Sequence, residues 1–272
     1  EEIKIILKYI KYKNNPYYFL DLSLLVAKSK YGSANLFEYV LFHKIDINKD
    51  VCCHACDSGN LEVLKLSHER GFKHDPLEYT RACKNGNHEC LQFLFDKKVS
   101  YPPKDDKYDD FLLKKDPYKV AAENGHVECL KCLHKNKAPR HDDNDDYGLY
   151  FLTNATATAS AINNGNIECL KFLMENGWEK SDGLISYTIH NTRLDEEVRL
   201  EIIKYLHSIG SEFDDLCTVA VKNDLIDYLK FAHTNGCELT NELACIASTA
   251  GSLKCLKYVH ENGIQLNKKM LR

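Results

Sequence analysis

Apolar and polar positions along the chain recur with a helical period, and the same pattern returns eight times. In a typical copy the apolar residues fall on one helical face: Ile167, Cys169, Leu170, Phe172 and Leu173. A shorter segment rich in alanine and cysteine precedes the apolar copies, and a glycine usually separates the two. The pattern predicts two short helices per unit, a thin helix followed by a bulkier one.

The bulkier segment carries the sequence of an internal repeat. Five copies share the pattern G-x-φ-[EK]-C-L-K-φ-φ-H, where φ is apolar, with departures in some copies, and they begin at Gly59, Gly86, Gly125, Gly165 and Gly251. Weaker copies centre on Tyr39, Ile203 and Leu229. The eight central positions are 39, 64, 91, 130, 170, 203, 229 and 256, so the spacings are 25, 27, 39, 40, 33, 26 and 27 residues. A unit of roughly 26 residues with three insertions accounts for these spacings, as in a repeat array.

Glycines are expected to mark both ends of the bulkier helix. The glycine between the two helices of a unit suits a tight turn with positive φ. A second set of glycines follows the bulkier helix, where a helix C-terminus favours this residue: Gly71, Gly177, Gly210, Gly236 and Gly263. Neither helix can bury its apolar face alone, so neighbouring units must stack.

One copy carries a family resemblance. Gly125-His-Val-Glu-Cys-Leu, preceded by Ala121-Ala122, resembles the A-A-x-x-G-H-x-x-x-[VL] centre of the ankyrin repeat. The short period and the Cys-Leu-Lys-Tyr/Phe-Leu-His-x-Asn-Gly phrasing resemble ankyrin arrays of giant DNA viruses and protists. The resemblance covers nearly the whole chain and implies an all-α ankyrin-repeat solenoid of stacked helix-turn-helix units. Only Pro117-Tyr118 resembles the T-P-L-H start of the family's unit, so the finger loops are expected to be short or irregular.

A leucine-rich repeat is the main alternative fold, because Leu61-x-x-Leu64-x-Leu66 fits its strand. The other units break that strand pattern, and an alanine-rich helix does not belong to it. We therefore expect a single ankyrin-repeat array over residues 1–272, with about eight units and a partial unit at each end. Residues 6–10 match the second helix of a unit whose first helix is missing, and residues 263–272 match the start of another unit. We therefore expect the sequence to be a fragment of a longer chain.

Charge and composition exclude several classes of partner. There are 36 lysines and arginines against 40 aspartates and glutamates, which gives a formal net charge of −4. Only six of the 36 cations are arginine, so a nucleic-acid partner is not expected. No run of about 18 apolar residues is present, and the lysines within the first twelve residues do not suit a signal peptide, so no membrane partner is expected.

The twelve cysteines are too unevenly placed for a disulfide framework. Several lie within apolar helical patterns, where a reduced thiol behaves as a small apolar side chain: Cys90, Cys129, Cys169 and Cys255. They predict a reducing, intracellular and cytoplasmic setting. Two pairs have the spacing of a zinc half-site, Cys53-x-x-Cys56 and Cys129-x-x-Cys132. Because this spacing also marks one buried helix face, we favour structural thiols, and no metal is expected.

Histidines recur at a fixed offset in the bulkier helix: His43, His68, His134, His207, His233 and His260. Stacked histidines suit a metal site or a pH switch, whereas a histidine near a helix C-terminus also interacts with exposed carbonyl groups. Packed helices lie ~8–10 Å apart, which is too far for side chains at equal heights to share zinc. We favour the interaction with carbonyl groups.

The acidic run Asp142–Asp146 suits either a calcium loop or a solvated loop. An EF-hand needs glycine at its sixth position and glutamate at its twelfth, and these are Tyr147 and Thr153 here, which favours the solvated loop. No G-x-S-x-G, H-E-x-x-H, Walker or dinucleotide-binding motif is found. We expect no catalytic residue, no cofactor and no small-molecule substrate.

Two consecutive units carry about 13 extra residues each, in Ser100–Asp116 and Ala138–Asn154, between a second helix and the next first helix. In an ankyrin array these connections form neighbouring fingers on the concave edge, so the insertions are expected to form one acidic, aromatic patch of the kind that anchors protein interfaces. The predicted partner-binding residues are Tyr101, Asp105, Asp106, Tyr108, Asp109, Asp110, Phe111, Asp142, Asp143, Asp145, Asp146, Tyr147, Tyr150 and Phe151. The alternative is neutral drift, because loops accept insertions at little cost. A third insertion, Asn191–Val198, falls between the two helices of its unit.

The resemblance and the insertions predict a non-catalytic scaffold that binds a protein partner, preferably a basic one, through its concave or finger face. Resemblance to viral ankyrin proteins implies a host-directed role in the host cytoplasm. Two alternatives remain open: a structural component of a larger complex or particle, which self-association would favour, and the targeting arm of a larger protein such as a ubiquitin-ligase substrate receptor.

Overall fold

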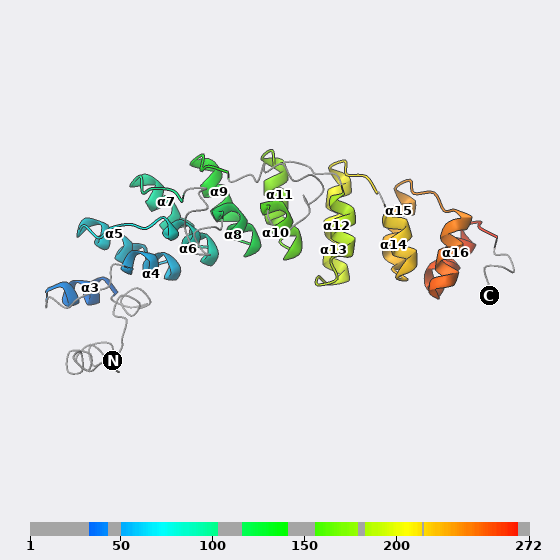
Figure 1. Ribbon diagram of the computed structural model, residues 1–272, viewed down its shortest axis with the longest axis horizontal. Helices are drawn as coiled ribbons and strands as arrows, with labels where there is room; N and C mark the ends of the chain where they lie inside the picture. The colour runs from blue at the N-terminus through cyan, green and yellow to red at the C-terminus, as the bar shows by residue number, and fades with distance from the viewer. Residues whose placement is uncertain are drawn as a thin grey trace, which may run out of the picture. The chain divides into compact units, whose positions relative to one another are not determined.

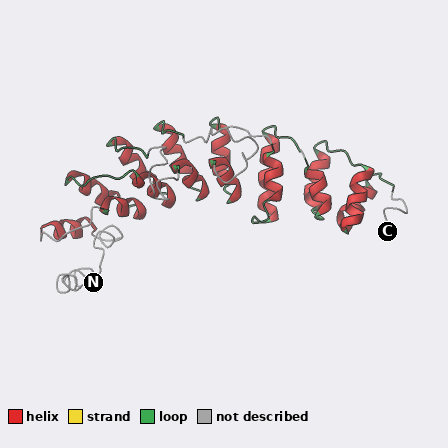
Figure 2. Ribbon diagram, in the orientation of Figure 1, coloured by secondary structure: helices red, strands yellow, loops and turns green. Residues whose placement is uncertain are grey.

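The computed structural model describes residues 33–42, 50–102, 116–140, 156–178, 183–213 and 215–265. In these ranges the secondary structure consists of fifteen helices without a strand (Figure 2). The expected all-α class is therefore confirmed, and a strand in each unit, which a leucine-rich repeat requires, is excluded for the described part. His43, the acidic run 142–146 and residues 1–32 and 266–272 lie outside the described ranges.

The described chain divides into two compact units, each made of helix pairs (Figure 1). The first unit contains α3 to α9, residues 157–161 of α10 and residues 168–175 of α11. The bounds are α3 Ser33–Phe42, α4 Val51–Ser58, α5 Leu61–Glu69, α6 Leu77–Asn85, α7 His88–Asp96, α8 Pro117–Glu123, α9 Val127–Lys135, α10 Ala157–Asn163 and α11 Ile167–Glu175. Each of the pairs from α4/α5 to α10/α11 is a first helix followed by a second, as the repeat predicts.

The second unit contains residues 162–167 and the helix pairs from α12 to α17. The bounds are α12 Leu184–His190, α13 Glu196–Ser208, α14 Leu216–Lys222, α15 Ile226–Thr234, α16 Asn241–Ala250 and α17 Leu253–Glu261. Because the chain forms two units, the single array over residues 1–272 stays a prediction.

The eight central positions of the repeat all lie in second helices, in the order α3, α5, α7, α9, α11, α13, α15 and α17. Six of them are fully buried: Leu64, Leu91, Leu130, Leu170, Ile203 and Leu229. The first helices contribute small buried side chains to the same cores, such as Ala55, Ala82 and Ala121. The predicted contrast between thin and bulky helices holds only in part, because the first helices α6 and α8 also bury the large side chains of Tyr79 and Tyr118.

The predicted positive φ angles are also confirmed, both at glycines between the helices of a pair and at glycines after second helices. Three other residues adopt the same backbone: Lys98 and Lys137 after second helices, with φ of 53° and 51°, and Asp224 between α14 and α15, with φ of 55°. The left-handed region is unfavourable for residues with a Cβ. These three positions therefore carry local backbone strain.

Replacing Lys98 by glycine is expected to raise the free energy of unfolding by about 0.5–1.5 kcal/mol, because glycine removes the left-handed penalty. Asp224→Gly is the matched control. The Asp224 carboxylate accepts a hydrogen bond from the Cys255 backbone N–H at 3.0 Å, in the first turn of α17, and glycine would lose it. We expect no gain from Asp224→Gly in urea denaturation followed by circular dichroism. Equal gains at both positions would contradict this account.

The third insertion is more ordered than the sequence indicates. The predicted insertion Asn191–Val198 is not wholly a connection, because α13 begins at Glu196 and takes in its last three residues. A Cβ at Gly165 would lie 3.0 Å from Val198 Cγ1 and 3.4 Å from Leu194 Cδ2, so both side chains cover this turn. The insertion thus packs on the turn between α10 and α11.

Candidate functional site

Of the fourteen predicted partner-binding residues, the structure describes Tyr101. The other thirteen lie in residues 103–115 and 141–155, outside the described ranges. Their role in binding stays a prediction. The residues where both insertions begin are described, and so is Asp116, where the first one ends.

Tyr101 is half-buried at the start of the first insertion. Its ring packs edge-on against Tyr79, with centroids 5.0 Å apart, and lies stacked on Phe95 at 6.2 Å. Burial raises the pKa of the Tyr101 hydroxyl, and the charge of Asp116 raises it further. The influence of Asp116 indicates that the two ends of this insertion lie close together. Tyr101 therefore belongs to the base of the insertion.

Both insertions start from a backbone group that a buried tyrosine holds. The Tyr79 hydroxyl, in α6, donates to the carbonyl of Val99 at 2.9 Å. The Tyr118 hydroxyl, in α8, approaches the carbonyl of Ala138 at 3.5 Å in the equivalent way. Each tyrosine is 1 % exposed and lies twenty residues before its acceptor. This repeated spacing is a signal that could have been found in the sequence.

The helices that precede the two insertions are neighbours. The Asn136 amide, directly after α9, donates to Gln92 Oε1 of α7 at 3.1 Å. Gln92 lies in the middle of α7, and α7 and α9 pack against each other, so the helices that precede the two insertions are neighbours in the first unit.

Tyr79→Phe is expected to lower the free energy of unfolding by about 1 kcal/mol, because it removes one well-formed hydrogen bond and keeps the ring. Tyr118→Phe should lower the free energy of unfolding by less, because the Tyr118 hydroxyl lies 3.5 Å from the Ala138 carbonyl, whereas the Tyr79 hydroxyl lies 2.9 Å from that of Val99. Urea denaturation of the two variants measures the difference. A larger loss for Tyr118→Phe would show that the Tyr79 contact does not anchor the insertion.

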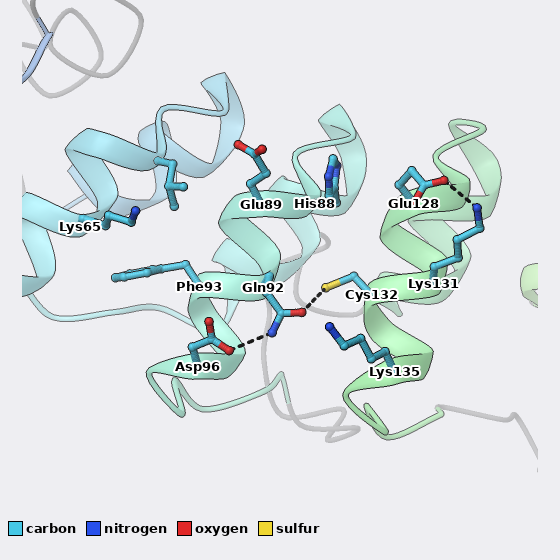
Figure 3. Close-up of a pocket in the computed structure, with 11 residues that line it drawn as sticks. Lys65, His88, Glu89, Gln92, Phe93, Asp96, Glu128, Lys131, Cys132 and Lys135 are labelled. Carbon is cyan, nitrogen blue, oxygen red and sulfur yellow. Dashed lines mark hydrogen bonds and ion pairs between the residues drawn. The ribbon is translucent and has the colours of Figure 1, made fainter.

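A groove of about 530 Å³ crosses the second helices α5, α7 and α9 (Figure 3). Its lining residues are Leu61, Lys65, His88, Glu89, Gln92, Phe93, Asp96, Glu128, Lys131, Cys132 and Lys135. Phe93 and Cys132 are nearly buried, whereas the charged residues stand at the exposed edges. The repeat pattern alone does not indicate this surface, although exposed charges recur at the same offsets in successive copies.

Charges of both signs line the groove and partly pair with one another. Lys131 donates to Glu128 at 2.7 Å, and this hydrogen bond lowers the pKa of Glu128. The Gln92 side-chain amide donates to the Asp96 carboxylate at 2.8 Å. The Cys132 thiol lies 3.7 Å from the side-chain oxygen of Gln92. Burial raises the pKa of Cys132 to about 11, so this thiol is protonated near neutral pH. The groove thus offers neither an activated nucleophile nor a field of one sign.

The recurrent histidines lie in the last turns of second helices, as expected: His68, His134, His207, His233 and His260. His260 Nδ1 lies 3.0 Å from the carbonyl of Ile264. The other four also contact an aromatic ring of the next second helix edge-on, in the pairs His68–Phe93, His134–Phe172, His207–Phe231 and His233–Tyr258, at centroid distances of 5.7, 5.9, 5.7 and 5.8 Å. The histidine column therefore joins neighbouring repeats through aromatic contacts, which the sequence did not indicate.

The cysteines named in the sequence are mostly core residues. Cys90, Cys129, Cys169 and Cys255 are buried thiols, and both C-x-x-C pairs lie within helices, α4 and α9. One pair differs from the expectation of reduced thiols, because Cys217 of α14 and Cys237 after α15 are joined as a disulfide. Packing of α14 against α15 within one helix pair brings together two cysteines that are twenty residues apart, which spacing alone does not indicate.

Comparison with known families covers the middle of the chain. Within the described residues, no helix has both the length and the apolar character needed to cross a bilayer. Comparison with curated proteins gives no significant match. Residues 79–183 match the family model of ankyrin repeats, in three copies, and with the helix pairs described above they identify the fold as an all-α ankyrin-repeat array.

Proposed function

We propose that this protein is a non-catalytic interaction module that binds a protein partner through the two acidic insertions, Ser100–Asp116 and Ala138–Asn154. Ankyrin repeats are generally protein-interaction modules, and residues 79–183, which match this family, contain both insertions. The observation that carries the proposal is the packing of α7 against α9, the two helices after which the insertions begin.

The residues at the starts of both insertions and at the end of the first support this role, because buried tyrosines and a hydrogen bond hold them. Tyr79 and Tyr118 hold the backbone at Val99 and Ala138, and the Asp116 side chain accepts from the Tyr118 N–H at the start of α8. A loop held at its ends loses less conformational entropy on binding than a free chain does. Two loops of this kind from neighbouring repeats would offer one continuous surface.

The composition of the insertions favours a basic partner. Eight aspartates lie within the two insertions, with aromatic residues among them. Charge complementarity increases association rates, and aromatic side chains supply much of the binding energy of protein interfaces. A partner segment rich in lysine or arginine therefore fits this surface better than an acidic or apolar one.

The test is selection of a random displayed peptide library on the purified protein. The acid-neutralised variant changes eight aspartates to asparagine: Asp105, Asp106, Asp109, Asp110, Asp142, Asp143, Asp145 and Asp146. The matched control makes the same change in charge at exposed helical acids: Glu62, Glu69, Glu89, Asp96, Glu175, Glu201, Asp227 and Glu242. Both variants leave Tyr101 and Asp116 in place, because these residues belong to the base of the first insertion.

We expect selection on the unchanged protein to enrich lysine- and arginine-rich peptides. These peptides should bind the control variant with unchanged affinity and the acid-neutralised variant at least tenfold more weakly. Enriched peptides without positive charge, or equal binding to both variants, would reject the insertions as the binding site. Self-association of the unchanged protein in light scattering, without any peptide, would instead favour the assembly role.

A further inference from the structure

A cluster of three metal-binding side chains lies in the first unit, away from both insertions. Cys52 Sγ, an imidazole nitrogen of His74 and a carboxylate oxygen of Glu78 all lie within 4.8 Å of one another. Cys52 comes from α4, His74 from the connection after α5, and Glu78 from the first turn of α6. The three side chains therefore converge from two successive repeats.

The Glu78 carboxylate is fully buried, which is costly unless its charge is compensated. Its Oε1 accepts the backbone N–H of Asp75 at 2.9 Å, and its Oε2 lies 2.6 Å from His74 Nδ1. His74 provides a positive charge only when it is protonated. A divalent cation would compensate Glu78 at neutral pH and would also neutralise a thiolate at Cys52.

Ordinary hydrogen bonding gives a competing account of the same residues. His74 Nε2 lies 2.9 Å from His68 Nδ1, so a chain of hydrogen bonds can run from His68 through His74 to Glu78. That chain would close the connection between α5 and α6 without an ion. It does not involve the Cys52 thiol, which is 0 % exposed and faces the same carboxylate.

The ligand types select among metals. Sulfur and imidazole nitrogen are preferred by zinc, whereas calcium and magnesium prefer oxygen ligands. The edge at His74 is the accessible one, because this side chain is 12 % exposed. The second imidazole nitrogen of His74 would keep its contact with His68, in the manner of partners that orient metal-binding histidines.

We propose that Cys52, His74 and Glu78 form a zinc site that joins α4 to the start of α6. Binding replaces the proton of the Cys52 thiol by the metal, so one proton leaves as the zinc–sulfur bond forms. Without metal, burial and the charge of Glu78 raise the pKa of Cys52 to about 12, so the thiol keeps its proton. The site is independent of the proposed partner binding.

The test is titration of the metal-free full chain with Co²⁺ and then Zn²⁺, in a phosphine reductant. Cobalt bound to a thiolate gives a charge-transfer absorption in the near ultraviolet. We expect one equivalent of Co²⁺ to produce this band and one equivalent of Zn²⁺ to remove it. Zn²⁺ should also raise the midpoint of thermal unfolding.

Two variants and one control distinguish this site from the other thiols. Cys52→Ser should abolish the band, and His74→Gln should weaken cobalt binding at least tenfold. Cys53→Ser changes the next buried thiol of the same helix, which lies outside the cluster, and should keep both the band and the thermal shift. Circular dichroism without metal checks that all three variants fold. No band in the unchanged protein, or a band that survives Cys52→Ser, would overturn the proposal.

Discussion

Replacing Gly59 by alanine is expected to lower the free energy of unfolding by about 3–4 kcal/mol, because strain adds to lost hydrogen bonds. Gly59 has a φ of +73°, and a Cβ there would lie 2.6 Å from Asn87 Oδ1. The Asn87 amide belongs to the next repeat and donates to the carbonyls of Cys56 and Asp57, at 2.7 and 3.1 Å. The new methyl group would displace Asn87 and break both contacts. Urea denaturation followed by circular dichroism measures the loss.

Gly251→Ala is the matched control for this substitution. Gly251 occupies the same place between the helices of its pair, with a φ of +72°, and a Cβ there would meet nothing within 4 Å. Only the backbone penalty remains, so we expect a loss of about 1–2 kcal/mol. Asn87→Ala alone should lower the free energy of unfolding. Added to Gly59→Ala it should lower it little further, because Gly59→Ala already breaks the hydrogen bonds of Asn87. Equal losses at the two glycines would mean that Asn87 does not couple the repeats.

Much of the fold could be predicted from the sequence, because stacking imposes a strict period on buried residues. A leucine placed at the centre of each second helix must face the neighbouring pair, so Leu64, Leu91, Leu130 and Leu170 are all buried. Glycine was predictable for a similar reason, since a tight turn between two helices needs a positive φ. Repetition made these signals visible in a single sequence.

Contacts between repeats could not be predicted in the same way, since they join residues that are distant in sequence. Asn87 reaches back over thirty residues to Cys56, and His126 Nε2 lies 3.1 Å from the carbonyl of Lys84. Lys98 and Asp224 adopt positive φ without being glycine, with φ of 53° and 55°. The conformational preferences of lysine and aspartate therefore do not predict these two turns.

The candidate sites show the same limit. The insertions were visible as departures from the period, yet the role of Tyr101 in the base of its loop depends on Tyr79 and Phe95 of its own repeat. Cys52, His74 and Glu78 match no linear zinc motif, because three different segments supply them. A binding site built from several repeats leaves no compact signature in the sequence.

Leu130→Ala should produce a loss of about 3–5 kcal/mol in the free energy of unfolding, the range for truncating a fully buried leucine. Leu130 is 0 % exposed at the centre of α9, and α9 packs against α8 and α7. Its removal leaves a cavity that helices on both sides cannot fill without shifting. Because repeats are stable only through their neighbours, the loss should also reduce the cooperativity of unfolding.

Leu256→Ala makes the same chemical change at the equivalent position of α17. Leu256 is half-buried, so truncation there removes less apolar contact and should cost about 1 kcal/mol. The pair separates the effect of burial from that of helix propensity, because leucine and alanine are both strong helix formers. If both variants lost equal stability in urea denaturation, burial of the central leucine would not determine the loss, and the packing account of Leu130 would have to be revised.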